Sequence, residues 1–181
     1  MENKFLYELC ESIIDCPHST PLWTQKGNVV IRNQNIRNGK LDLSIEYYTD
    51  NEHFQSRRKR AKPEAGDIII TREAPMGEVC IIPDGLECCL GQRMVLLKPN
   101  TLLCDNKYLL YILMSKPVQH QISWSEGTGT TVSNLRIPHL EKLKIPYPPL
   151  EKQRQIASVI SCLDDKINLN CRINHNLPFA A

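Results

Sequence analysis

Apolar and polar positions alternate in the middle of the chain with the two-residue period that a half-buried strand requires. The clearest alternation runs from Leu41 to Tyr47, and a short β-branched segment covers Asn28–Arg32. Three further apolar runs, bounded by glycine and proline, occupy Asp67–Thr71, Glu78–Ile82 and Met94–Lys98. The pattern therefore predicts a core of several short strands.

Other segments carry helical or ambiguous signals. Residues Lys4 to Ile14 are rich in apolar side chains and fit either a strand or a short helix. The charged segment Asn51–Lys62 has little apolar content and fits a surface helix or a loop. Asp105 is expected to cap the first turn of a helix, which Pro117 ends or kinks because proline lacks an amide hydrogen. These segments add short helices to the strand-rich core.

A different periodicity begins at Leu150, after a last short strand at Leu143–Ile145 and a proline-rich exit over residues 146–149. Apolar residues then recur at spacings of four, three and four, which is the period of an α-helix. This narrow stripe is typical of a seam between paired helices, and a polar Asn170 on it would fix their register. The predicted pairing positions are Ile156, Ile160, Leu163, Ile167, Asn170 and Leu177.

The two patterns together predict an α+β chain in two parts. Residues 1–147 form a β-rich domain with short helices, and residues 148–181 form a projecting C-terminal α-helix that pairs as a coiled coil. A length of 181 residues suffices for one domain with an appendage, and a hydrophobic fraction of 41% supports an ordinary packed core. Because the helix follows prolines, we expect its apolar stripe to need a partner outside the domain.

Composition narrows the function classes only in part. The net charge of +2 does not by itself indicate a nucleic-acid partner, since local clustering decides such binding. Eight cysteines lack a C-x-x-C pair, and the adjacent Cys88 and Cys89 do not suit one tetrahedral metal ion, so neither a metal nor a cofactor is expected. Charged residues interrupt the N-terminus and no apolar run reaches membrane-spanning length. These features predict a cytoplasmic protein with reduced thiols and no membrane partner.

The proline-rich segment carries a family resemblance. The sequence IPYPPLEKQRQIA, residues Ile145–Ala157, resembles the junction motif of type I restriction–modification specificity subunits, in which a strand and prolines lead into a helix. Residues Leu163–Asn168 continue this helix pattern, Gly66–Ile70 resembles the GD-I segment of the family, and Gly127–Gly129 resembles its GT loop. The junction is the specific motif, and the resemblance extends over nearly the whole chain.

This resemblance implies DNA recognition without catalysis in this chain. Specificity subunits of the family carry two target-recognition domains separated by long helices, and each domain recognises half of a split target in double-stranded DNA. Partner methyltransferase and restriction subunits hold the chemistry. This chain departs from the pattern because it has one recognition domain and one helix. We expect a half-subunit that pairs with a second copy or another half-subunit, or else a truncated or exchangeable unit, and the ending Leu177–Ala181 favours truncation.

The strongest basic cluster lies in the charged segment near residue 60. Basic side chains neutralise phosphates and release counterions, so this cluster is a candidate DNA contact. A solvated charged face is the competing interpretation. The candidate residues are Arg57, Arg58, Lys59, Arg60 and Lys62.

Polar residues beside turns form a second group of candidates. Arginine, glutamine and asparagine can recognise base edges or hold phosphates. Asparagine also organises turns, and arginine also pairs with acidic neighbours, so structural roles compete with DNA contact at each position. The candidates are Arg32, Gln34, Asn35 and Arg37 in one turn, Arg72 after a strand, Gln92 and Arg93 after the permissive Gly91, and the loop hydroxyls of Thr128 and Thr130.

Other function classes compete with DNA recognition. Pro83-Asp84 followed by Asp105-Asn106-Lys107 mimics the spaced carboxylates of metal-dependent DNA nucleases. The first of these segments is also a typical tight turn and the second a helix cap, which favours chance. A helix-mediated oligomerising adaptor without DNA binding explains the terminal helix but not the polar loops. A DNA methyltransferase is excluded, because the chain has no glycine-rich cofactor loop and no matching catalytic tetrapeptide.

Overall fold

The computed structural model describes residues 2–124 and 134–176, and a four-stranded antiparallel sheet lies at its centre. The strand order is β2–β11–β8–β9. Val95 in β11 is paired with Asp15 on one side and with Ile70 on the other, so β11 is an interior strand. The four strands are Cys10–Asp15 (β2), Met94–Pro99 (β11), Ile68–Thr71 (β8) and Val79–Ile81 (β9).

Both faces of this central sheet are buried. Ile68 and Ile70 belong to one hydrophobic cluster, whereas Ile69 between them belongs to another. Successive side chains of a strand point to opposite faces, so a strand covered on both sides needs apolar residues at every position. That requirement explains the run of three isoleucines and confirms the strands that were predicted around β8, β9 and β11.

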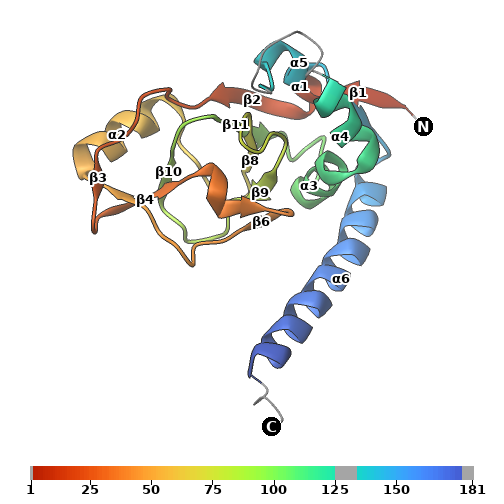
Figure 1. Ribbon diagram of the computed structural model, residues 1–181. Helices are drawn as coiled ribbons and strands as arrows, with labels where there is room; N and C mark the ends of the chain where they lie inside the picture. The colour runs from red at the N-terminus through yellow and green to blue at the C-terminus, as the bar shows by residue number, and fades with distance from the viewer. Residues whose placement is uncertain (1, 125–133, 177–181) are drawn as a thin grey trace.

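A second four-stranded sheet lies beside the central sheet (Figure 1). It shares the hydrophobic cluster of Ile69 with one face of the central sheet. Its order is β10–β4–β7–β3, in which β10 and β4 are parallel and the other neighbours antiparallel. Helix α2, Asn51–Arg60, packs against this sheet through Phe54, which contacts Val30 and Cys89. The strands are Cys88–Leu90 (β10), Asn28–Ile31 (β4), Tyr48–Thr49 (β7) and Trp23–Thr24 (β3).

Short helices cover the other face of the central sheet. Helix α3, Asn106–Met114, begins after Asp105, whose Oδ1 accepts a hydrogen bond from the Tyr108 amide at 2.9 Å. The predicted cap is therefore confirmed. Pro117 lies in the first turn of the next helix, α4 (Lys116–Ser123), so two helices meet just before this proline. The other two helices of this layer are Leu6–Leu9 (α1) and Ile137–Glu141 (α5).

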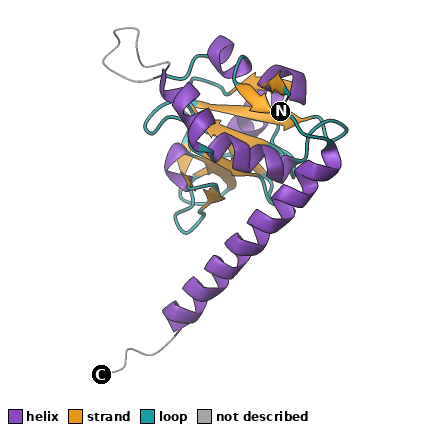
Figure 2. Cartoon of the chain, turned by 90° about the vertical axis from the view of Figure 1, so that its right-hand side faces the viewer, coloured by secondary structure: helices purple, strands orange, loops and turns teal. Residues whose placement is uncertain are grey.

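The first and last strands of the globular part lie side by side. Strand β1, Asn3–Phe5, pairs antiparallel with β12, Lys144–Pro146, and places Asn3 opposite Pro146. Helix α6, Leu150–Asn176, follows and projects from the globular part as a rod (Figure 1, Figure 2). The predicted α+β class with a long C-terminal helix is confirmed.

The strand predicted over Leu41–Tyr47 is wrong. Only the two-residue strand β6, Lys40–Leu41, overlaps this range. The carbonyls of Asp42 and Ile45 each accept a hydrogen bond of 2.9 Å from Asn35 Nδ2. A side-chain amide that satisfies backbone carbonyls takes the place of a partner strand and holds the segment as a turn. Periodicity alone does not reveal this competition.

The ambiguous segments contain both kinds of structure. Residues 4–14 form β1, α1 and β2 in succession, and most of the segment from residue 51 to 62 is helix α2. No helix within the described residues is long and apolar enough to cross a membrane. All eight cysteines are free, and the buried ones are Cys16, Cys80, Cys88, Cys89 and Cys104.

Candidate nucleic-acid interface

A polar pocket of about 390 Å³ collects candidate residues from several separate segments. It lies where the loop before β3, the turn after β4 and the loop before β11 come together. Four predicted contacts, Arg32, Gln34, Gln92 and Arg93, line it, and none of its lining residues is acidic. The full lining is Thr20, Pro21, Trp23, Arg32, Asn33, Gln34, Ala74, Gly91, Gln92 and Arg93.

Arg32 holds its guanidinium over two aromatic rings. Its Cζ lies 4.5 Å from the centroid of the Tyr47 ring and 5.1 Å from that of Trp23. The two rings meet edge to face with centroids 5.9 Å apart. Within the described residues, the guanidinium makes no hydrogen bond. A cation on aromatic faces is attracted by the ring quadrupoles, so Arg32 is positioned while its donors stay free.

The turn that follows Arg32 is stabilised by a hydrogen bond between its own residues. A single 3-10 turn, η1 (Asn33–Asn35), follows Arg32 and leads into β5 (Ile36–Arg37). The Arg32 amide donates to Asn35 Oδ1 at 2.9 Å, and Asn35 is only 3% exposed. Asn35 therefore organises the turn, which is the competing structural role considered for it. The exposed Arg37 donates to the carbonyl of Ile36 at 3.0 Å.

Gly91 brings the opposite wall of the pocket close to β4. Its amide donates to the Ile31 carbonyl at 2.8 Å, and a Cβ at Gly91 would lie 2.9 Å from that same oxygen. Gln92 Nε2 then donates to the His18 carbonyl and, at 3.1 Å, to Thr20 Oγ1. Arg93 has a left-handed backbone with φ of 64°. This conformation, together with the close approach that Gly91 permits, places the side chains of Gln92 and Arg93 in the lining of the pocket.

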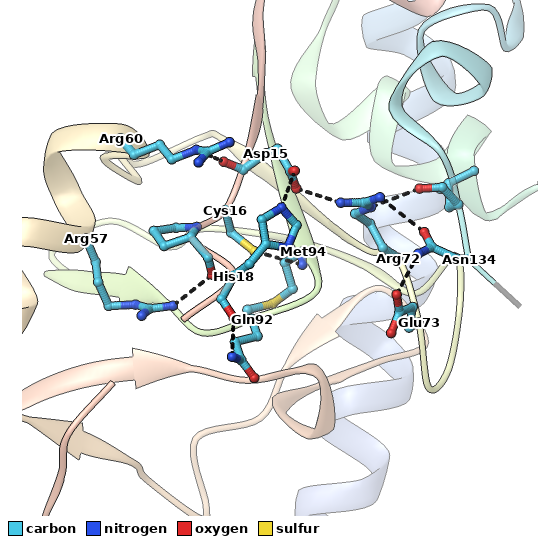
Figure 3. A network of polar contacts seen from close by, with 12 residues as sticks. Asp15, Cys16, His18, Arg57, Arg60, Arg72, Glu73, Gln92, Met94 and Asn134 are labelled. Atoms are coloured by element: carbon cyan, nitrogen blue, oxygen red, sulfur yellow. Dashed lines mark hydrogen bonds and ion pairs between the residues drawn. The ribbon is translucent and has the colours of Figure 1, made fainter. Parts of the chain in front are cut away.

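Arg72 lies outside the pocket lining, at the centre of a polar network (Figure 3). Its Nη1 donates to Asp15 Oδ1 at 2.9 Å, its Nε donates to the Leu135 carbonyl at 2.9 Å, and its Nη2 donates to Asn134 Oδ1 at 3.2 Å. The side chain is only 13% exposed. Each guanidinium nitrogen of Arg72 is thus engaged with this chain. The acidic partner is Asp15, whereas the sequence neighbours Glu73 and Glu78 were the partners considered for it.

Glu73 connects that network to the pocket. One carboxylate oxygen accepts from Asn134 Nδ2 at 2.6 Å, and the other lies 3.2 Å from Arg93 Nε. Its carbonyl accepts from Asn33 Nδ2 at 2.5 Å. Figure 3 shows how Asp15, Arg72 and Asn134 lead to Glu73. Through Glu73 this network supports Asn33 and Arg93 in the pocket wall.

The basic segment of α2 is largely occupied by contacts with its own chain. Arg57 is 4% exposed and donates to the carbonyls of Leu90, Ser19 and Pro17 at 2.7, 2.8 and 3.2 Å. This burial lowers the pKa of Arg57. Arg58 donates to the Cys88 carbonyl and pairs with Glu87, Arg60 donates to the Asp15 carbonyl, and Lys62 pairs with Glu64.

Lys59 is the exposed member of that cluster without a described partner. Thr128 and Thr130 lie outside the described residues. Sequence reasoning missed Trp23 and Tyr47, the platform under Arg32. Their signal was weak, because two aromatic residues far apart in sequence show no periodic relation to an arginine.

The predicted helix seam is packed against the core at its start and exposed farther along α6. Ile156 packs against the core, and Gln153 and Ala157 beside it are buried. Farther along α6, Leu163 and Ile167 are 60% and 53% exposed. Ile160 is half-buried, Asn170 is exposed, and Leu177 lies outside the described residues. Exposed apolar residues that were not predicted are Val159, Leu169 and Ile173.

The family model described as the type I restriction modification DNA specificity domain matches residues 1–178. The chain belongs to this family. Two relatives from Methanocaldococcus jannaschii are named as specificity subunits of type I restriction enzymes, MjaIX and MjaVIII. MjaIX is 33% identical over 56% of this chain and 23% of its own length. MjaVIII is 32% identical over 69% of this chain and 29% of its own length.

Solved structures of specificity subunits share this fold. The crystal structure of the type I restriction–modification S subunit from M. genitalium matches 97% of this chain and 42% of its own, with a TM-score of 0.66 and 22% identity. The curated family relatives are named as specificity subunits rather than catalytic ones. This chain spans between about a quarter and two fifths of the length of the first curated relatives that it matches.

Proposed function

We propose that this chain is a target-recognition unit of a type I specificity subunit, which binds double-stranded DNA in a sequence-specific manner and leaves catalysis to other polypeptides. The pocket that brings Arg32, Gln34, Gln92 and Arg93 together carries the proposal. Hydrogen-bonding side chains from separate loops, held on a rigid two-sheet scaffold, suit the recognition of base edges. Membership of the family supports the same interpretation.

The proposed mechanism is non-covalent. Exposed basic side chains such as Lys59 hold phosphates and set the register of the protein on the duplex. Side chains of the pocket then contact base edges. The buried Arg57 and the engaged Arg72 act by shaping the loops, so we do not include them among the direct contacts.

The proposal extends to protein partners. The names of the relatives lead us to propose methyltransferase and restriction subunits, together with a second specificity chain or half-subunit along α6. We propose a division at residue 147, where β12 has ended and the prolines before α6 begin. The free thiols suit a reducing cytoplasm.

The competing functions gain no support. Asp105 accepts a hydrogen bond from the Tyr108 amide as a helix cap, as its structural interpretation required. Within residues 2–124 and 134–176, no group of three His, Cys, Asp or Glu side chains could hold a metal ion. An oligomerising adaptor without DNA binding leaves the pocket without a ligand.

Binding-site selection from random duplex DNA tests the proposal, with the methyltransferase subunit of the same restriction system present. We expect enrichment of one short sequence by the wild-type chain. The Arg93→Ala variant should weaken that enrichment, because the side chain faces the pocket and is 56% exposed. Arg154→Ala, which removes the same charge from α6, is the matched control and should select as wild type does. A wild-type pool without any enriched sequence would contradict the proposed function.

A further inference from the structure

Arg32 differs from the other arginines that the sequence suggested as contacts. Its guanidinium makes no hydrogen bond within the described residues, and it is half-buried at the wall of the pocket. The other six all donate to, or pair with, oxygen atoms of this chain: Arg37, Arg57, Arg58, Arg60, Arg72 and Arg93. Arg32 therefore has its donors available for a ligand.

The aromatic platform sets the plane of that donor group. Trp23 and Tyr47 both lie within about 5 Å of Arg32 Cζ, and Gln34 Nε2 donates to the Tyr47 hydroxyl. A guanidinium that rests on ring faces loses little further freedom when it binds, because its planar fork is already oriented. Such a fork suits a ligand that presents two acceptors side by side.

The neighbouring groups distinguish a base from a phosphate. The His18 carbonyl can only accept, so the amide nitrogen of Gln92 must face it. Gln92 lines the pocket, and its Oε1 accepts no hydrogen bond from the described residues. A phosphodiester has no hydrogen-bond donor to offer an acceptor oxygen in the same pocket as Arg32. The pocket suits a base pair that offers two acceptors to the arginine and a donor beside them.

Guanine meets these conditions in the major groove. It presents N7 and O6 as adjacent acceptors, and the paired cytosine presents an N4 donor. Adenine offers one acceptor and one donor, and thymine offers one acceptor and a methyl group. We propose that Arg32 is a specificity-determining residue that contacts guanine N7 and O6 in the target, with Gln92 Oε1 accepting from the paired cytosine. This inference rests on the proposed function.

The test compares binding of the selected duplex and of duplexes changed one base pair at a time. Replacing the guanine that Arg32 contacts should weaken wild-type binding roughly 10- to 100-fold. Arg32→Ala should lose that discrimination at one position and keep it at the others. Arg32→Lys should lose most of it, because an ammonium lacks the planar fork. Arg154→Ala on α6 again serves as the control of equal charge.

A base analogue tests the same contact without altering the protein. 7-deazaguanine lacks the N7 acceptor and still pairs with cytosine. We expect it to weaken wild-type binding at one position only, and to leave Arg32→Ala binding unchanged at that position. The wild-type measurement is independent of how any variant folds.

Two results would overturn the inference while the proposed function survives. One is an Arg32→Ala variant that keeps every base preference. The other is a uniform loss of affinity across sequences with a salt slope reduced by about one, which marks a phosphate contact. If the wild-type chain selects no sequence at all, the proposed function fails first and the inference fails with it.

Discussion

Basic side chains of α2 that are chemically alike differ in their burial. Arg57 and Lys59 are two residues apart, yet Arg57 is 4% exposed and Lys59 faces solvent. The Arg57 guanidinium satisfies three backbone carbonyls, two in the loop before β3 and one at the end of β10, and thereby ties α2 to both. Its role follows from the acceptors around it and not from its charge.

Arg57→Ala should therefore lower the free energy of unfolding by about 3 kcal/mol, because it leaves buried carbonyls without donors. Urea unfolding followed by circular dichroism measures this change. Lys59→Ala is the matched control and should change stability by less than about 0.5 kcal/mol. Equal stability of the two variants would contradict the structural role of Arg57.

The buried thiols make stability depend on alkaline pH. Burial raises the pKa of Cys80 to about 12, with a smaller contribution from Cys88, and burial also raises the pKa of Cys104 to about 12. In the unfolded chain these thiols ionise near pH 9, so above that pH the unfolded state binds fewer protons than the folded state. This stabilisation is complete below pH 9 and is lost as the pH rises toward 12.

Urea unfolding between pH 8 and pH 10.5 should consequently show a falling free energy of unfolding. Cys80→Ala should fall less steeply over this range, whatever its stability at pH 8. Cys162→Ala, which alters an exposed thiol, should follow the wild-type slope. Parallel slopes for wild type and Cys80→Ala would show that this thiol makes no contribution.

The residue scale also marks how far the sequence leads toward the site. Arg32, Gln92 and Arg93 could be selected because they flank turn-forming residues. Their meeting in one pocket could not be predicted, since it depends on a contact between Gly91 and Ile31 across the sheet. Trp23 was not predicted as a site residue either, because its contact with Arg32 also depends on the folded structure.

At the scale of elements, α6 is joined to the globular part by a buried polar side chain. Gln153 is fully buried. Its Oε1 accepts from the Asp105 amide at 3.0 Å, and its Nε2 donates to the carbonyls of Leu103 and Pro148 at 3.1 and 2.9 Å. One side chain thus connects the first turn of α6 to the loop that leads into α3.

Gln153→Leu should lower the free energy of unfolding by about 2–3 kcal/mol, because it removes three hydrogen bonds from a closed site. Hydrogen exchange at the Asp105 amide should accelerate as well. Gln155→Leu on the exposed side of the same helix is the control, and its effect should stay below about 0.5 kcal/mol. An unchanged Asp105 exchange rate would contradict this connection.

Elements with strong local signals were predictable, and elements defined by competition were not. The caps and prolines around α3 and α6 act within a few residues, so the sequence indicates them directly. The error at Leu41–Tyr47 arose because the side chain of Asn35 satisfies carbonyls that an alternating pattern assigns to a partner strand.

At the scale of the whole molecule, the central sheet divides the interior into two main hydrophobic clusters, one shared with the second sheet and one with the helices. The sequence predicted a strand-rich core, but the strand orders combine segments that are distant in the chain. Pairing between distant strands is fixed by tertiary packing, so period and composition do not define it.

Apolar side chains on the part of α6 beyond the globular core are exposed, and we expect them to mediate assembly. Leu163 and Ile167 lie one helical turn apart and are 60% and 53% exposed. We expect the chain to associate through them, with mass measured by sedimentation equilibrium. Leu163→Glu together with Ile167→Glu should abolish that association, because each glutamate would place a charge in an apolar seam.

Lys166→Glu on the same helix is the control for added negative charge and should leave the measured mass unchanged. An association that persists in the double variant, or a wild-type chain that is monomeric with and without a second specificity chain, would refute pairing through this stripe.

The antiparallel contact between β1 and β12 has a consequence for how such a protein can be rearranged. The chain enters the globular part through β1, beside the start of α6, and leaves it through β12 at the same place. A polypeptide fused ahead of Glu2 would start next to the opening turn of the rod. The globular part can therefore be inserted between two helices at one position of a host chain, because its two ends lie together.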